Sequence, residues 1–194
     1  MEFADVLSAR RMHRDFLDVE LSDEVAGRIV NAGLRGPSAG FAQGLELLVL
    51  KGESRHKYFE ITRPETWGQP GMANASLVVL PIVDPEAYLR RYQQADKVHT
   101  GMSTQDGWAV PYWWVDAGAA AMAMLLAAAN EGVGALLYTL GGNEAAVLEA
   151  FGVPLDRRCS GPLVFGIPAN DEVTGSAATR QRRPAGESIH IDVW

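Results

Sequence analysis

The sequence predicts a single domain of the α+β class over residues 1–194, and three observations support this expectation. Helical patterns come first, and strands and helices then follow without the regular β-α-β series of a parallel sheet. The apolar runs that could form strands are short. A long run of small residues at 113–131 has the composition of a central helix that neighbours approach closely on several sides.

The expected helices follow from residue spacing and from end signals. Phe3, Val6 and Leu7 recur at helical spacing and predict a first helix at residues 2–10. Ser22 is a favourable N-cap for a second helix, which runs to about residue 34 and ends before Gly36-Pro37. Further helices are expected at residues 53–62, 85–94, 113–131 and 143–151.

Apolar runs predict buried strands at residues 45–50, 76–83, 135–139 and 163–167, with Pro81 weakening the end of the second. Residues 176–194 show no globular pattern until Ile189, Ile191 and Val193, whose alternation suits an extended strand. This segment either frays, as termini commonly do, or forms an arm that docks on another subunit.

Composition and charge exclude several classes of protein. A formal net charge of -7 argues against nucleic acid as a partner, because phosphate backbones require a basic face. The one cysteine, Cys159, cannot form an internal disulfide and is expected to be a small packed residue, which suits a reducing cytoplasm. The N-terminus has no signal-peptide pattern, and the longest apolar stretch is shorter than the roughly 20 residues of a membrane span. We therefore expect a cytoplasmic protein without a membrane partner.

Two arginine clusters stand near the ends of the chain. Arg10, Arg11 and Arg14 follow the first helix, and a second cluster at residues 180–183 lies near the C-terminus. Arginine binds phosphate through two hydrogen bonds and stays charged, so these clusters suit a permanent phosphate site. A solvated basic helix end explains the first cluster equally well.

Two glycine-containing segments could admit a ligand. Residues 36–44 connect a helix to a buried strand, and their small residues let backbone amides approach a ligand, with Ser38 and Gln43 adding polar reach. Leu140, Gly141 and Gly142 stand between a strand and a helix, where free amides favour an electron-rich ligand atom. Either segment read alone is also an ordinary loop or turn.

An aromatic cluster precedes the central helix. Aromatic residues of this kind either pack in a core or interface, or form a pocket wall that stacks on a flat ligand, and the two roles can coexist. No histidine or cysteine spacing suits a metal, and no acid–base pair is evident, which fits chemistry carried by a bound cofactor. The cluster comprises Trp108, Pro111, Tyr112, Trp113 and Trp114.

Taken in order, these segments resemble the FMN-dependent nitroreductase family over essentially the whole chain. Each motif is short, and the resemblance rests on their order and spacing together. The matching positions are Arg10, Arg14 and Phe16; Pro37, Ser38, Ala39 and Gln43; residues 116–121; residues 141–143; and Arg180, Arg182 and Pro184.

The resemblance implies a central, mostly antiparallel sheet flanked by helices, in a homodimer with a domain-swapped C-terminal arm. It implies two FMN sites at the dimer interface, each using residues of both subunits. The amide of Gly141 would face the flavin N5 atom, where hydride is received and given. The other assignments are Arg10, Arg14, Arg180 and Arg182 at the phosphate with Arg11 nearby, Pro37, Ser38, Ala39 and Gln43 from the partner's loop, and Leu140 and Gly142 beside Gly141.

Two departures from the family pattern bear on the substrate. Phe41 stands where the family commonly has asparagine, and Gly44-Leu45 replaces a Pro-Trp pair. An apolar ring at position 41 removes a polar group near the flavin or substrate, or stacks on the substrate itself. Asn74 is a candidate for the contact that some members make to the flavin pyrimidine.

The implied function is a ping-pong oxidoreductase. NAD(P)H would reduce FMN and leave, and a nitroaromatic, a quinone or a similar small oxidant would take its place between Phe41 and the residues Trp108, Tyr112, Trp113 and Trp114. Three alternatives stay open: a protein that stores flavin without turnover, an enzyme that uses reduced flavin in a biosynthetic or dehalogenation step, and an interaction module whose arginines bind an acidic partner.

Overall fold

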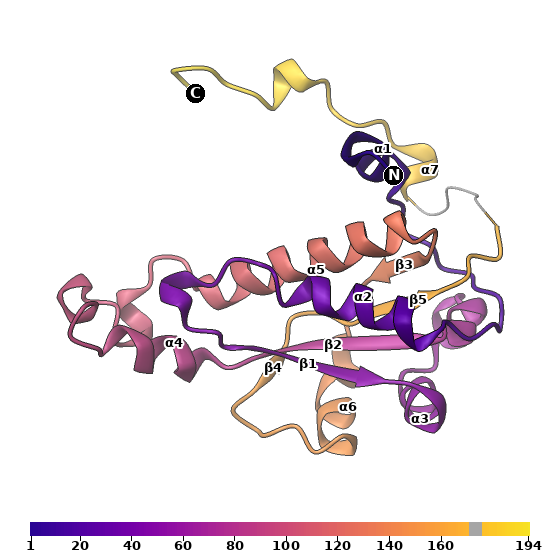
Figure 1. The fold of residues 1–194 in the computed structure, drawn as a ribbon, viewed down its shortest axis with the longest axis horizontal. Coiled ribbons are helices and arrows are strands. Elements are labelled where there is room, and N and C mark those ends of the chain that lie inside the picture. Colours follow the sequence, from indigo (N-terminus) through magenta and orange to yellow (C-terminus); the bar gives the residue numbers. More distant parts are fainter. Residues whose placement is uncertain (171–175) are drawn as a thin grey trace.

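A five-stranded sheet forms the centre of the computed structural model, which describes residues 1–170 and 176–194 (Figure 1). The strand order is β1-β2-β5-β3, with β4 beside β2, and every pairing in the described residues is antiparallel. The expected α+β class and antiparallel sheet are confirmed. The strands are β1 (Leu45–Leu50), β2 (Leu77–Val83), β3 (Gly134–Leu137), β4 (Arg158–Cys159) and β5 (Leu163–Gly166).

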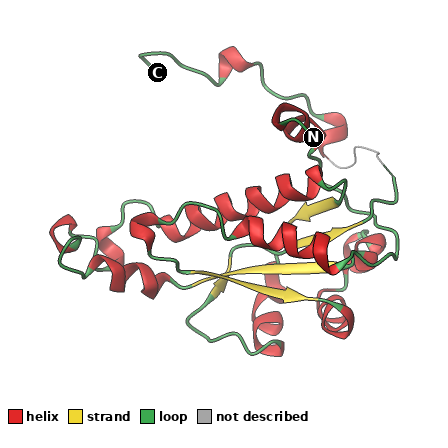
Figure 2. Cartoon of the chain, in the orientation of Figure 1, coloured by secondary structure: helices red, strands yellow, loops and turns green. Residues whose placement is uncertain are grey.

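Helices cover both faces of this sheet, so the strands form a middle layer (Figure 2). In Figure 1, α2 and α5 lie on one face and α3 and α6 on the other, while α4 packs at one end. The helices are α1 (Phe3–Ala9), α2 (Asp23–Gly33), α3 (Gly52–Thr62), α4 (Pro85–Tyr92), α5 (Tyr112–Asn130), α6 (Glu144–Ala150) and α7 (Ser176–Thr179).

Strand β2 is buried along its whole length because both of its faces are covered. Leu77 and Val79 pack into the cluster beneath α2 and α5, whereas Val78 and Leu80 pack into the cluster beneath α3 and α6. Pro81 lies where the neighbour of β2 changes from β5 to β4, and its carbonyl accepts the Ser160 amide at 3.1 Å. Proline has no backbone N–H. Because Pro81 lies between the two partner strands, no hydrogen bond of either pairing is lost on that side of β2.

The observed element boundaries agree closely with the sequence expectations. The Ser22 side chain accepts a hydrogen bond from the Val25 amide at 3.3 Å and caps α2 as expected. The two-residue strand β4 and the short helices α7, Ala39–Phe41 and Pro64–Trp67 were not expected. Such elements contain too few residues to leave a periodic pattern.

The expected strand at residues 189–193 is not formed, and this expectation was wrong for the single chain. Ile189, Ile191 and Val193 are exposed, and the segment runs clear of the sheet in Figure 1. A strand requires hydrogen bonds from a neighbouring strand, and no strand of the described chain lies beside this segment. The expected arm at residues 176–194, whose first residues form α7, stays a prediction.

Helix α5 is apolar on nearly every side. Met124 and Ala128 face the core, whereas Val115 and Met122 are 47% and 40% exposed. By length and composition alone α5 also suits a membrane span, a test that the core helices of soluble proteins pass as well. Its buried face packs against α2 and β3, so the structure places α5 in the core and leaves one apolar side uncovered.

Candidate functional site

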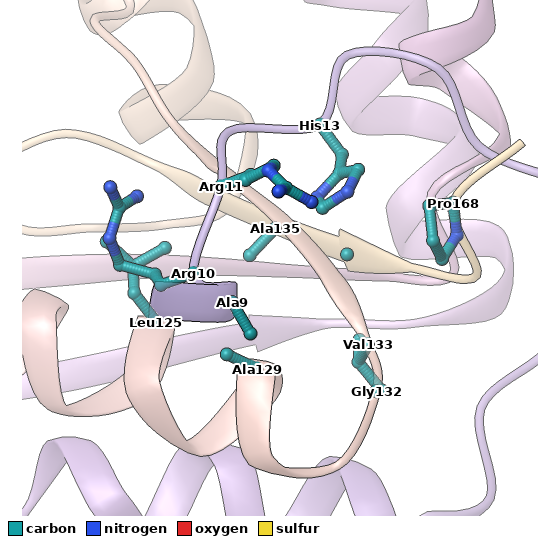
Figure 3. A pocket seen from close by; sticks show the side chains of 11 residues that line it. Ala9, Arg10, Arg11, His13, Leu125, Ala129, Gly132, Val133, Ala135 and Pro168 are labelled. Atoms are coloured by element: carbon teal, nitrogen blue, oxygen red, sulfur yellow. The ribbon is translucent and has the colours of Figure 1, made fainter. Parts of the chain in front are cut away.

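The two arginines that directly follow α1 line a small pocket (Figure 3). Its volume is about 170 Å³, and its walls come from the end of α1, the C-terminal part of α5 and the start of β3. Figure 3 shows the side chains of Arg10 and Arg11 leaving the chain in different directions. The other lining residues are Ala9, His13, Leu125, Ala129, Gly132, Val133, Gly134, Ala135 and Pro168.

Arg10 has the property expected of an anion-binding residue. Its Nη1 atom is buried and has no hydrogen-bond partner in the part of the chain that the structure describes. Burying an unpaired polar group costs free energy, and a phosphate oxygen would satisfy a guanidinium nitrogen. A solvated basic helix end does not account for this burial, so the structure favours the phosphate interpretation of Arg10.

The segment after these arginines is attached firmly to the sheet. The His13 amide donates to the Ala135 carbonyl at 2.8 Å, and the buried Phe16 forms a bridge with Pro168. Arg14 does not line the pocket, and its Nη1 atom donates to the Met12 carbonyl at 3.4 Å. The structure thus brings Arg10 and Arg11 together and places Arg14 a few residues away on the same segment.

The C-terminal arginines lie outside this pocket. Arg180 and Arg182 follow α7, are exposed, and contribute nothing to the pocket lining. A phosphate site that uses both arginine clusters therefore stays a prediction.

The loop at residues 36–44 forms a second pocket, of about 280 Å³, with the end of α2 and with α5. Ser38 Oγ accepts a hydrogen bond from the backbone amide of Gln43 at 2.9 Å, which closes the loop on itself. Phe41 and Gln43 have φ angles of 56° and 53°, in the left-handed region that non-glycine residues rarely adopt. The lining residues are Gly33, Leu34, Gly36, Pro37, Ser38, Phe41, Gln43, Leu45, Tyr88, Asp116 and Ala120.

A buried carboxylate anchors this loop from α5. Asp116 is 4% exposed, and its Oδ2 atom accepts the Ala39 amide and the Tyr88 hydroxyl, each at 2.8 Å. Burial and the hydrogen bond to Asp116 raise the pKa of Tyr88, so the phenol keeps the proton that it donates. The Arg91 Nε atom donates to the Gly40 carbonyl at 2.7 Å and fixes the middle of the loop.

The turn at residues 140–142 joins β3 to α6. The Gly141 amide donates to Thr139 Oγ1 at 3.3 Å, and Gly141 has a φ of 54°, which glycine adopts readily. No atom lies within 4 Å of the position that a Cβ on Gly141 or Gly142 would take, so a ligand can approach this backbone closely. Leu140 is buried and holds the turn against the core.

A pair of tyrosines lies next to this turn: Tyr138, which precedes it, and Tyr58 of α3. The Tyr138 and Tyr58 hydroxyls share a hydrogen bond, and burial raises the pKa of both phenols. The Trp67 ring lies 5.7 Å from the Tyr138 ring, measured between centroids. Burial also raises the pKa of the nearby Cys159 thiol to about 11, as expected for a packed rather than a reactive cysteine.

The aromatic cluster divides into two parts. Trp108 and Trp113 are each 6% exposed, and their ring centroids are 5.7 Å apart in a cluster with Tyr88. For these two tryptophans the packing role expected as one alternative is confirmed. Tyr112 and Trp114 are 45% and 39% exposed on α5, so a pocket-lining role stays a prediction for them.

Helix α5 lines both pockets, the loop pocket near its start and the arginine pocket near its end. Asp116 and Ala120 line the loop pocket, whereas Leu125 and Ala129 line the arginine pocket. Asp116 and Ala129 are thirteen residues apart on one helix, which separates them by about 20 Å at 1.5 Å per residue. The two pockets of a single chain therefore do not form one continuous cavity.

Comparison with known families identifies the family of this chain. The profile of the nitroreductase family matches residues 7–167, which is most of the chain and includes the arginine pocket, the loop and the turn. The chain belongs to the nitroreductase family.

Individual relatives agree with this assignment. A nitroreductase-family chain from Archaeoglobus fulgidus, provisionally named NADH dehydrogenase/NAD(P)H nitroreductase, is 27% identical, and the alignment covers 100% of this chain and 99% of that one. NADPH:FMN oxidoreductase from Vibrio harveyi, solved with NAD+, is 21% identical with a TM-score of 0.73, covering 99% of this chain and 77% of that one.

Nitroreductase CinD from Lactococcus lactis, solved with chloramphenicol, is 22% identical with a TM-score of 0.74. That alignment covers 98% of this chain and 99% of the other. At this level of identity, the two solved structures establish that this member of the nitroreductase family shares their fold.

Several residues that contact the loop or line the arginine pocket were not predicted from the sequence. Tyr88 and Arg91 of α4 contact the loop at residues 36–44, and Asp116 was noted only as part of the helix motif. His13 lies in the arginine cluster and also lines the pocket. No local pattern could reveal Tyr88 or Arg91, because their partners lie far away in the sequence.

Proposed function

We propose that this chain is an FMN-dependent oxidoreductase that transfers hydride from NAD(P)H to a small oxidant and works as a homodimer. Its membership in the nitroreductase family supports this proposal, as do the names of relatives that contain NAD(P)H nitroreductase and NADPH:FMN oxidoreductase. The observation in the chain that carries it is the buried, unpaired Nη1 atom of Arg10 in a pocket at the end of α1.

The residues present fit the phosphate end of FMN. A pocket of about 170 Å³ lined by two arginines has room for a phosphate group. Arg10 and Arg11 would bind the phosphate through charged hydrogen bonds. Arg14, Arg180 and Arg182 would complete the site once the C-terminal segment docks.

FMN, when bound, supplies a two-electron centre that exchanges hydride with both substrates in turn. NAD(P)H would bind first and leave as NAD(P)+, and a nitroaromatic, a quinone or a similar small oxidant would then bind in its place. The Gly141 amide would exchange its 3.3 Å hydrogen bond to Thr139 Oγ1 for one to the flavin, and the open backbone at Gly141 and Gly142 admits such an approach. Solvent would supply the protons, because the pocket offers no obvious acid–base pair.

The position of the two pockets on α5 supports a composite site. They lie near opposite ends of one helix and share no lining residue. A two-fold axis beside α5 would bring the loop pocket of one protomer next to the arginine pocket of its partner. The exposed apolar residues Val115 and Met122 are suited to such an interface. Pro37, Ser38, Ala39 and Gln43 would then line the flavin of the partner.

Exposed aromatic side chains provide a surface for planar substrates. Phe41 is 74% exposed, and Tyr112 and Trp114 also present part of their rings to solvent. Aromatic rings bind flat apolar molecules by offset stacking. We therefore assign the substrate surface to these three residues, with Trp108 and Trp113 supporting it from the core.

The absorbance spectrum of the purified protein tests the proposal directly. We expect a yellow protein with a flavin spectrum that bleaches when NADPH or NADH is added without oxygen and recovers when a nitroaromatic or quinone is added. A protein that neither contains FMN nor binds added FMN contradicts the proposal. A bound flavin that neither nicotinamide bleaches would favour storage over turnover.

Substitution of the buried arginine tests the phosphate site. Arg10→Ala should weaken FMN binding at least tenfold, because a charged hydrogen bond to a phosphate is worth about 1.5–3 kcal/mol. Arg35→Ala is the matched control, because Arg35 is exposed just after the end of α2, does not line the arginine pocket, and its loss changes the net charge equally. Equal FMN affinity in the two variants, measured by flavin fluorescence titration, would rule out Arg10 as a phosphate ligand.

A further inference from the structure

The loop at residues 36–44 is held in a costly conformation before any ligand is bound. Gly40, Phe41 and Gln43 all have φ angles between 53° and 60°. For the two non-glycine residues this region is unfavourable, so such backbone persists only where surrounding contacts determine it. The loop therefore needs anchors outside itself.

The anchors come from α4 and α5 and converge on the backbone of the loop. Asp116 Oδ2 accepts the Ala39 amide at 2.8 Å, and Arg91 Nε donates to the Gly40 carbonyl at 2.7 Å. The ring of Tyr92 lies so close to Gly40 that a Cβ there would stand 2.7 Å from it. These contacts fix main-chain atoms of the loop, and the Phe41 side chain stays exposed.

Asp116 and Tyr88 form the centre of this arrangement. Tyr88 is buried, and its hydroxyl donates to the same Oδ2 atom that accepts the Ala39 amide. Trp108 and Trp113 pack against the Tyr88 ring with centroids at 6.1 and 5.9 Å, which fixes the direction of its hydroxyl. The tyrosine thereby holds the carboxylate in the orientation that receives the loop amide.

We propose that Asp116 and Tyr88 are positioning residues that hold the loop at residues 36–44 in its flavin-binding conformation before the cofactor arrives. The assignment of FMN as the ligand rests on the proposed function, whereas the anchoring of the loop by Asp116 and Tyr88 does not. Asp116 acts through the Ala39 amide, and Tyr88 acts through Asp116. FMN then binds to a preformed surface and loses no affinity to ordering the loop.

Hydrogen exchange of the full-length, flavin-free protein tests the positioning role. Asp116→Ala should accelerate exchange of the loop amides, including that of Ala39, and should weaken FMN binding about tenfold. Tyr88→Phe removes one donor and should produce a smaller change in the same direction. Asp116→Asn should restore both properties to near wild type, because its side-chain carbonyl can accept both hydrogen bonds.

A buried residue away from the loop provides the control for general loss of stability. Ile29 of α2 is fully buried against α5 and the sheet, so Ile29→Ala should lower the melting temperature without changing loop exchange or FMN affinity. Unchanged loop exchange in Asp116→Ala overturns the proposal, as does equal acceleration in Ile29→Ala or a failure of Asp116→Asn to rescue. Absence of FMN binding by the wild type would instead remove the proposed function, and the exchange comparison would still decide the role of Asp116.

Discussion

At the scale of single residues, Phe41 combines backbone strain with an exposed ring. Its φ of 56° is unfavourable for a bulky residue, and its side chain is 74% exposed, so packing within the chain does not repay the strain. Asparagine tolerates this backbone region several-fold better. We expect Phe41→Asn to raise the free energy of unfolding by about 0.5–1 kcal/mol, measured by urea denaturation, and to weaken the binding of aromatic substrates.

The control for Phe41 is Leu34, which lines the same pocket, is exposed and has an ordinary φ of -81°. Leu34→Asn removes a comparable apolar side chain without relieving strain and should not stabilise the fold. A Phe41→Asn variant that is less stable than wild type would mean that the ring packs against something other than solvent, most simply the partner subunit.

At the scale of elements, α4 determines how the loop enters β1. Gly44 pairs with the residue at the end of β2, since the Asp84 amide donates to the Gly44 carbonyl at 2.8 Å. A Cβ at Gly44 would stand 2.5 Å from the Tyr88 ring and 2.7 Å from the Asp84 carbonyl oxygen. Gly44→Ala should therefore cost about 1–3 kcal/mol of stability, because the ring and the backbone must both move.

The same substitution at Gly27 is expected to have the opposite sign. Gly27 lies inside α2, and no atom approaches within 4 Å of the position of its Cβ. Alanine there should stabilise the helix by about 0.5–1 kcal/mol. Denaturant titration of the two variants separates the packing effect from the general effect of replacing glycine. Equal stability of Gly44→Ala and wild type would contradict the close approach of α4.

The larger elements were predictable because burial leaves a periodic pattern. The seven residues of β2 are all apolar or proline, and α2 combines an N-cap at Ser22 with helical spacing. The two-residue strand β4 leaves no such pattern, because its place depends on the neighbour that β2 offers after Pro81. The strand expected at residues 189–193 had the right alternation and lacked a neighbour in its own chain.

At the scale of the whole molecule, the sequence indicated which segments form the site but not how they are held together. Arg10, Ser38 and Gly141 lie in motifs that could be read locally, and the structure places each beside a pocket or an open backbone. The contact from Asp116 to Ala39 spans 77 residues and depends on the packing of α5. Contacts of this range follow from tertiary structure and leave no signature in either segment alone.

The uncovered apolar side of α5 supports the prediction that two chains are needed for one complete site. Placing a charge on this side should separate the protomers, because burying an unpaired carboxylate in an interface is costly. We expect Met122→Glu to convert the protein to a monomer of 21.0 kDa in light scattering and to abolish high-affinity FMN binding in the same step. The loss would occur although Arg10 itself is unchanged.

Leu155→Glu is the matched control, because Leu155 is fully exposed and lies in the loop after α6, on the opposite face of the sheet. It adds the same charge to an exposed apolar position and should leave the dimer and its flavin intact. A Met122→Glu monomer that still binds FMN with wild-type affinity would show that one chain suffices. The loop at residues 36–44 would then lose its assigned role toward the flavin of the partner.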